Sequence, residues 1–101
     1  MAAAEHIPTL DMLRAQRQEI LRIAASRGAH NVHVFGSVAR GDARDTSDID
    51  LLVEMEPGRD VLDLSELILD LEECLHRQVD VIELGRSSPF ADRVRSEAIP
   101  L

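Results

Sequence analysis

The chain has 101 residues, of which 45% are hydrophobic and 30% charged, and we expect residues 1–101 to form a single globular domain with one modest core. Its net charge is −8 and its aromatic residues number two, which argues against a surface that binds phosphate backbones or stacks on bases. All eleven basic residues are Arg, which excludes P-loop and Schiff-base chemistry because both use a lysine amine. The single cysteine, Cys74, cannot form an internal disulfide.

The first predicted element is a helix that opens after Pro8 and Thr9 and ends at Gly28, because leucine, isoleucine and alanine recur there at near-helical spacing. Two short β-branched or aliphatic runs then predict strands, at residues 31–35 (NVHVF) and 49–53 (IDLLV). Between them, the segment SVARG predicts a short helical turn.

After Pro57 and Gly58, residues 61–77 predict an amphipathic helix and residues 79–84 a third strand. A last helix is expected to begin with Ser88 as its N-cap and to end before Pro100. This order predicts an α/β (α+β) fold, in which helices pack on a small mixed sheet of three to four strands. No apolar run of 18 residues and no signal architecture occurs, so we expect no membrane association and a cytoplasmic location.

Gly36 and Ser37 follow the first predicted strand and open the short helical segment. Free backbone N–H groups and a hydroxyl at a helix N-terminus can bind an anion, and glycine lets a phosphate approach the main chain. A plain turn with an N-capping serine has the same sequence, so this pair alone decides nothing.

Asp48 and Asp50 are separated by one residue, so both side chains are expected on one face of the second strand. Two neighbouring carboxylates repel each other, and a divalent cation such as Mg²⁺ between them relieves that repulsion. About one such pair is expected by chance in a chain this rich in Asp. The functional interpretation therefore depends on the Gly-Ser turn placed ten residues earlier.

Asp80 lies inside the third apolar strand, where an isolated acid is costly to bury. It is explained if that strand neighbours the Asp-x-Asp strand and Asp80 reaches the same site, as a metal ligand, a general base or both. An exposed aspartate on an edge strand is the alternative.

Together, GSVARGDARDTSDIDLLV and the downstream Asp80 resemble the signature of the nucleotidyltransferase superfamily that includes DNA polymerase beta. The small size, the SDIDLLV run and the C-terminal SPFADRVRSEAIPL are similar to the minimal nucleotidyltransferases, the MNT antitoxins that are paired with HEPN toxins. The resemblance implies a polymerase beta-like core that uses ATP as its substrate and binds Mg²⁺ in a two-metal site.

 

By that resemblance, Asp48, Asp50 and Asp80 are the catalytic and metal-binding residues, while Gly36 and Ser37 hold the β- and γ-phosphates. Asp80 would also deprotonate the acceptor hydroxyl. In-line displacement at the α-phosphorus needs charge neutralisation rather than a nucleophilic side chain, which agrees with this set of residues.

Two further residues are candidates for binding the nucleotide. Arg40 lies three residues after Ser37 on the same helical face and could reach the triphosphate, or it could pair with Asp42 or Asp45 instead. Ser47 could orient Asp48 or touch a phosphate, or it could only complete a turn.

The implied reaction is the transfer of AMP from ATP to a tyrosine hydroxyl of a HEPN ribonuclease toxin, with this chain as the antitoxin in a hetero-oligomer. A charge of −8 suits a partner that is basic enough to bind RNA. Two other hypotheses stay open: a non-catalytic module that masks its toxin stoichiometrically, and the catalytic subunit of a small-molecule nucleotidyltransferase.

Overall fold

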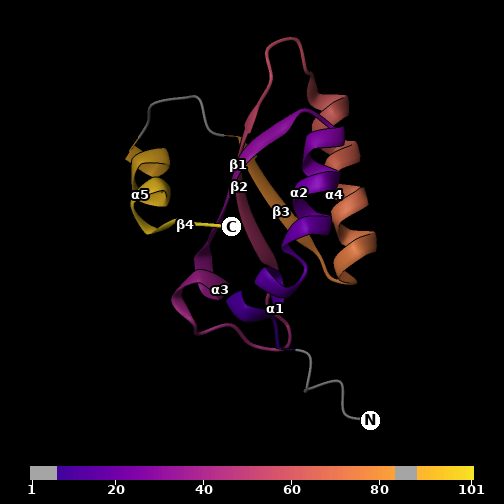
Figure 1. Cartoon of the computed structure of the whole chain (residues 1–101). Helices are drawn as coiled ribbons and strands as arrows, with labels where there is room; N and C mark the ends of the chain where they lie inside the picture. The colour runs from indigo at the N-terminus through magenta and orange to yellow at the C-terminus, as the bar shows by residue number, and fades with distance from the viewer. Residues whose placement is uncertain (1–6, 84–88) are drawn as a thin grey trace.

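The computed structural model describes residues 7–83 and 89–101 (Figure 1). The first half of the chain forms α1 (Leu10–Ala15), α2 (Arg17–Ser26), β1 (Ala29–Phe35), α3 (Gly36–Arg40) and β2 (Ile49–Met55). The second half forms α4 (Val61–Leu75), β3 (Val79–Glu83), α5 (Pro89–Glu97) and β4 (Ile99–Pro100). Leu84 and Ser88, the predicted end of the third strand and the predicted N-cap of the last helix, lie outside the described residues.

The four strands form one mixed sheet in the order β3-β2-β1-β4. β1 pairs antiparallel with both β2 and β4, whereas β2 and β3 are parallel neighbours. A parallel pair needs a long crossover, and α4 supplies it between β2 and β3. The predicted mixed sheet with helices packed on it is confirmed.

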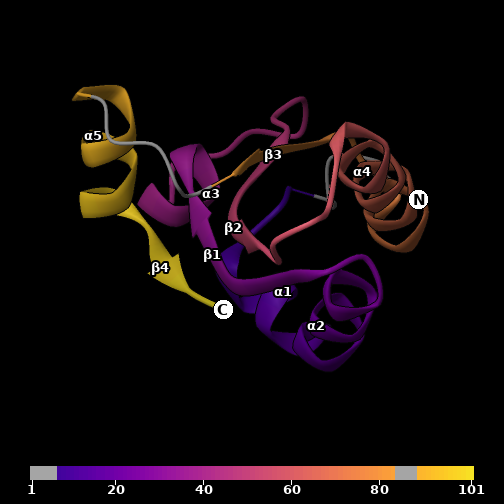
Figure 2. The ribbon, with the colours of Figure 1, turned by 90° about the horizontal axis from the view of Figure 1, so that it is seen from above.

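The sheet has helices on both faces, with α2 and α4 on one side and α5 on the other (Figures 1 and 2). The larger core lies under α1, α2 and α4, and alternate strand residues such as Val34, Leu51 and Val79 point into it. The smaller core joins Phe35 and Leu52 to α5. Within residues 7–83 and 89–101, no helix combines the length and the apolar character that crossing a bilayer requires.

The N-terminal helix is the main difference from the expected elements, because the chain forms two helices where one was predicted. The chain leaves helical geometry at Gln16, whose φ and ψ are −106° and 17°. Leu13 in α1 and Ile20 in α2 are both fully buried in the same core. Because seven residues are close to two helical turns, the apolar pattern keeps its phase across the break and does not reveal it.

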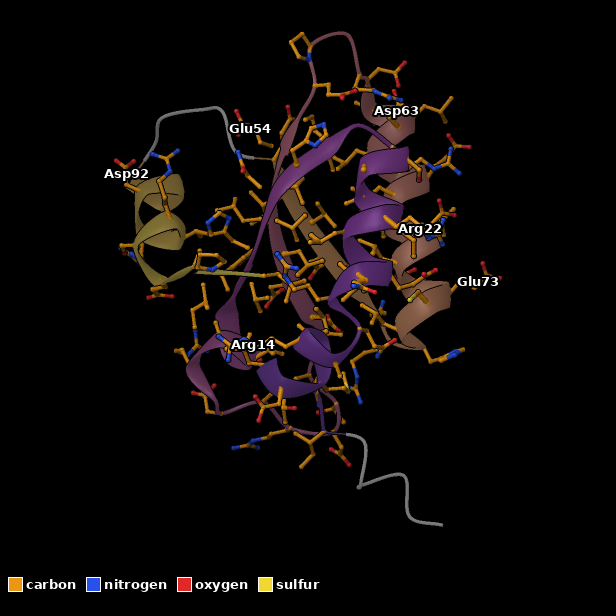
Figure 3. The ribbon with its side chains drawn as sticks, viewed as in Figure 1. Arg14, Arg22, Glu54, Asp63, Glu73 and Asp92 are labelled. Carbon is orange, nitrogen blue, oxygen red and sulfur yellow. The ribbon has the colours of Figure 1, made fainter. Side chains whose placement is uncertain are left out.

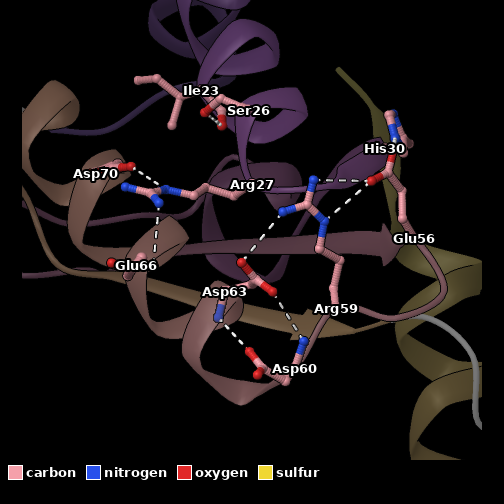
Figure 4. Close-up of polar contacts among 10 residues, drawn as sticks. All are labelled: Ile23, Ser26, Arg27, His30, Glu56, Arg59, Asp60, Asp63, Glu66 and Asp70. Atoms are coloured by element: carbon pink, nitrogen blue, oxygen red, sulfur yellow. Dashed lines mark hydrogen bonds and ion pairs between the residues drawn. The ribbon is translucent and has the colours of Figure 1, made fainter.

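The loop from β2 into α4 is fixed by charged side chains at its two ends (Figure 4). Asp60 and Asp63 form a reciprocal capping box at the start of α4. Arg59 pairs with Glu56 at 3.2 Å and with Asp63 at 3.4 Å, so its guanidinium links the end of β2 to the first turn of α4. These contacts set where the crossover helix begins.

His76 follows α4 in the left-handed region, with φ 55° and ψ 40°. This conformation is costly for a residue with a Cβ, and glycine adopts it freely. We expect His76→Gly to stabilise the fold by about 0.5–1 kcal/mol, measured by urea unfolding. His76→Asn should fall between the two, and a loss of stability in the glycine variant would show that the imidazole makes a stabilising contact.

Candidate active site

The Gly-Ser turn stands where β1 ends and α3 begins. Phe35 is the N-cap residue of α3, and its side chain has no acceptor atom to cap the helix. Ser37 therefore lies inside the first turn and is not the N-cap, which was the alternative interpretation of this serine. The first-turn N–H groups and the Ser37 hydroxyl together form a donor set suited to phosphate oxygens.

The three predicted carboxylates come to the same end of the sheet. Asp50 on β2 and Asp80 on β3 are register partners across the parallel pair, and Asp48 directly precedes β2. Asp80 is exposed on an edge strand, as the alternative interpretation had it, and it also neighbours Asp50, as the functional interpretation required. Exposure of Asp80 on an edge strand is therefore compatible with its lying beside Asp50 at the candidate site.

Gly36 lies directly against the Asp50 carboxylate. A Cβ built on Gly36 would lie 2.3 Å from Oδ2 of Asp50, and φ of Gly36 is +74°. Any larger residue would therefore have to displace the carboxylate and adopt an unfavourable backbone conformation. The structure thus gives this glycine a role beside Asp50 that the sequence did not indicate.

Asp50 has an electrostatic environment that disfavours its charge. Partial burial raises the pKa of Asp50, the charges of Asp80 and Asp48 raise it further, and the charge of Arg40 lowers it. Mutual repulsion among carboxylates is what a divalent cation relieves. The raised pKa therefore agrees with a site suited to a cation.

This raised pKa predicts how stability depends on pH. The folded chain keeps a proton on Asp50 at pH values where the unfolded chain has lost it, so stability should fall as pH rises from about the ordinary aspartate value of 3.8 through the raised pKa. Asp50→Asn should unfold at a higher temperature than the unchanged chain above that window and at a similar one below it. Thermal unfolding of both proteins in EDTA across acidic and neutral pH checks this, and equal midpoints at neutral pH would contradict it.

Arg40 is the last residue of α3. Its guanidinium pairs with Asp42 at 3.4 Å and approaches Glu97 of α5 at 3.9 Å. It also lowers the pKa of Asp50, so its charge acts on the site. The pairing with Asp42 that was the alternative for Arg40 therefore occurs, and a contact of Arg40 with the triphosphate stays a prediction.

Ser47 completes a turn in the structure. Its Oγ accepts a hydrogen bond from the Arg44 N–H at 2.8 Å, and its own N–H donates to the Arg44 carbonyl at 3.0 Å. This is the turn role that was the alternative to nucleotide binding. The hydroxyl proton can still be donated to another acceptor.

The donor set suits Mg²⁺, because hard carboxylate oxygens are its preferred protein ligands. In the described part of the chain, no three such side chains already stand together at ligand distances. Two aspartates on adjacent strands and a third directly before β2 nevertheless provide carboxylate donors at one end of the sheet, and Gly36 leaves room for the Asp50 carboxylate there. Asp48, Asp50 and Asp80 are the residues that would hold it.

Sequence patterns missed two residues near the site, Glu97 and Arg77. Glu97 approaches Arg40 from α5, and Arg77 contacts the loop that precedes Asp48. Both contacts join segments more than 25 residues apart, so no local spacing signals them. Charged residues at helix ends are common, and only their tertiary contacts distinguish Glu97 and Arg77 from the other charged residues at helix ends.

Comparison with known proteins defines the class. Residues 17–100 match the model of the nucleotidyltransferase domain family, and the chain belongs to this family. It is 40% identical over 73 residues to the protein adenylyltransferase MntA of Thermococcus cleftensis, covering 71% of this chain and 74% of that protein. The family resemblance drawn from the motif is confirmed, and the relatives support an adenylyltransferase enzyme.

Solved structures agree on the fold. A candidate minimal nucleotidyltransferase superposes with a TM-score of 0.81 and 48% identity, covering 92% of this chain and 96% of that one. A structure of a tri-AMPylated HEPN toxin of Shewanella oneidensis in complex with an MNT antitoxin gives a TM-score of 0.66 at 20% identity, with coverage of 88% and 71%. At that identity the second likeness shows the fold alone.

Proposed function

We propose that this chain is a Mg²⁺-dependent nucleotidyltransferase that moves AMP from ATP to a tyrosine hydroxyl of a HEPN ribonuclease toxin and so acts as its antitoxin. The observation that carries the proposal is that Asp48, Asp50 and Asp80 come to the same end of the sheet, where the Asp50 carboxylate lies against Gly36. The name of the adenylyltransferase relative and the toxin complex of the structural neighbour support the nucleotide and the partner. A cytoplasmic site of action follows from this partner.

In the proposed reaction, the acceptor oxygen forms a bond to the α-phosphorus while the bond to the bridging oxygen breaks and pyrophosphate leaves. Bound Mg²⁺ would neutralise phosphate charge and make the acceptor hydroxyl more acidic. Ser37 and the first N–H groups of α3 would orient the β- and γ-phosphates, with Arg40 as a cationic contact.

Asp80 would take the proton of the acceptor hydroxyl. Its exposure on the edge strand β3 supports this role, because a hydroxyl carried by another protein must reach the base from outside. Asp50 is more buried and lies between β1 and β3 in the sheet, so it suits a metal ligand better than a base toward a large acceptor.

Stoichiometric masking of the toxin without transfer is the second candidate. It is favoured by α4, which leaves Val61, Leu62 and Leu69 between 64% and 78% exposed. Exposed apolar side chains gathered on one helix are typical of a contact surface. A binding surface is also compatible with catalysis, so the transfer itself must be measured.

Intact-mass spectrometry of a HEPN toxin incubated with this chain, ATP and Mg²⁺ tests the proposal. We expect the toxin to gain about 329 Da for each AMP transferred and its ribonuclease activity to fall. Asp48→Asn/Asp50→Asn is the control and should leave the mass unchanged. Equal inhibition by both proteins with no mass change would show masking instead.

A further inference from the structure

The loop between α3 and β2 presents Asp48, and a residue far along the chain holds it. Arg77 lies in the turn between α4 and β3. Its Nη1 donates hydrogen bonds to the main-chain carbonyls of Asp45, at 2.7 Å, and Ser47, at 2.9 Å. One guanidinium nitrogen therefore holds the loop at two main-chain carbonyls, those of residues 45 and 47, just before Asp48.

The peptide groups on both sides of Asp48 are fixed by this same turn. The Ser47 carbonyl belongs to the peptide that precedes Asp48, and Arg77 holds it. The Ile49 N–H belongs to the peptide that follows Asp48, and it donates to the Gln78 carbonyl at 3.0 Å. Because two fixed peptide planes determine φ and ψ of the residue between them, residues 77 and 78 set the direction in which the Cα–Cβ bond of Asp48 leaves the main chain.

We infer that Arg77 is a positioning residue for the reaction, which acts by orienting Asp48 toward the metal-binding site. The inference rests on the proposed function of Asp48. An arginine suits this role because its planar guanidinium offers several N–H donors in fixed directions, whereas a lysine ammonium is a flexible point donor. Gln78 contributes through its main chain, so its side chain is free to vary.

Groups that orient a metal ligand typically change metal affinity or activity by about 10–100-fold when removed. We therefore expect Arg77→Met to bind Mn²⁺, an EPR-visible substitute for Mg²⁺, about tenfold or more weakly in the presence of a non-hydrolysable ATP analogue. Arg77→Lys should lie between Arg77→Met and the unchanged chain. Free Mn²⁺ measured by EPR gives this readout without any turnover.

Arg17→Met is the matched control. Arg17 also donates through its guanidinium to a distant main-chain oxygen, that of the last residue, Leu101. Its removal costs a hydrogen bond between a guanidinium and the main chain that lies away from the loop before Asp48. It should lower thermal stability and leave Mn²⁺ affinity unchanged.

A double-mutant cycle shows whether Arg77 acts through Asp48. If it does, Arg77→Met/Asp48→Asn will bind Mn²⁺ no more weakly than Asp48→Asn alone. Additive losses, or an affinity within about threefold of the unchanged chain in Arg77→Met, would overturn the inference. If Arg77→Met does not fold, Arg77→Lys takes its place in the cycle. Unimpaired Mn²⁺ binding and transfer in Asp48→Asn would instead overturn the proposed function, so the two failures are distinguishable.

Discussion

Asp50→Asn is expected to reduce AMP transfer by about a thousandfold or more while leaving the fold intact. The substitution keeps the shape of the side chain but removes the charge of one proposed metal ligand, and metal-based charge stabilisation contributes several kcal/mol to such reactions. Stability should not be lost, because the carboxylate charge is already disfavoured by burial and by Asp80 and Asp48. Release of pyrophosphate in the presence of the toxin measures the effect.

Glu54→Gln is the matched control for this prediction. Glu54 lies on the same strand and the same side of the sheet, four residues and about 13 Å from Asp50. Glu54 lies near the end of β2 that is farther from α3 (Figure 3). Transfer within about twofold of the unchanged chain is expected, since a single distant charge is screened. A comparable loss in both variants would mean that net charge, and not the site, controls the reaction.

Gly36→Ala is expected to be the second most damaging change. The new Cβ would lie 2.3 Å from Oδ2 and 3.1 Å from Cγ of Asp50, so the carboxylate must move. A displacement of about 1 Å at a reacting centre commonly costs about a hundredfold in rate. The positive φ of Gly36 adds about 1–2 kcal/mol of backbone cost to the folded state. Transfer rates and urea unfolding measure the two effects separately.

Gly58→Ala separates the displaced carboxylate from the backbone cost. Gly58 has φ +90° in the loop after β2, and a Cβ there would meet nothing within 4 Å. It should lose a similar amount of stability and keep its transfer rate. If Gly58→Ala loses transfer as well, reduced stability is the cause in both variants, and the contact between Gly36 and Asp50 has no catalytic importance.

The local pattern of the sequence predicted β1, β2, β3, the long α4 helix and the short helix after Gly36, but it missed the two-residue strand β4, where the end of the last helix was expected. The predicted elements are strongly patterned: β-branched or aliphatic runs bounded by glycine, and leucines at helical spacing after a capping aspartate. The predicted ends of two elements were wrong by two residues. β1 begins at Ala29 and not at residue 31, and α4 ends at Leu75 and not at residue 77. Local propensity is weak at such ends, and tertiary hydrogen bonds decide them.

The sequence alone was enough to propose Gly36, Ser37, Asp48 and Asp50 as site residues, because their residue types and spacing are local. The register that places Asp80 beside Asp50 became visible only in the folded chain. The tertiary structure alone also decided that Gly36 leaves room for a carboxylate and that Arg77 holds the loop before Asp48. The physical reason is that register and side-chain contacts between distant segments arise from packing the sheet and α4 together, and no short-range pattern records them.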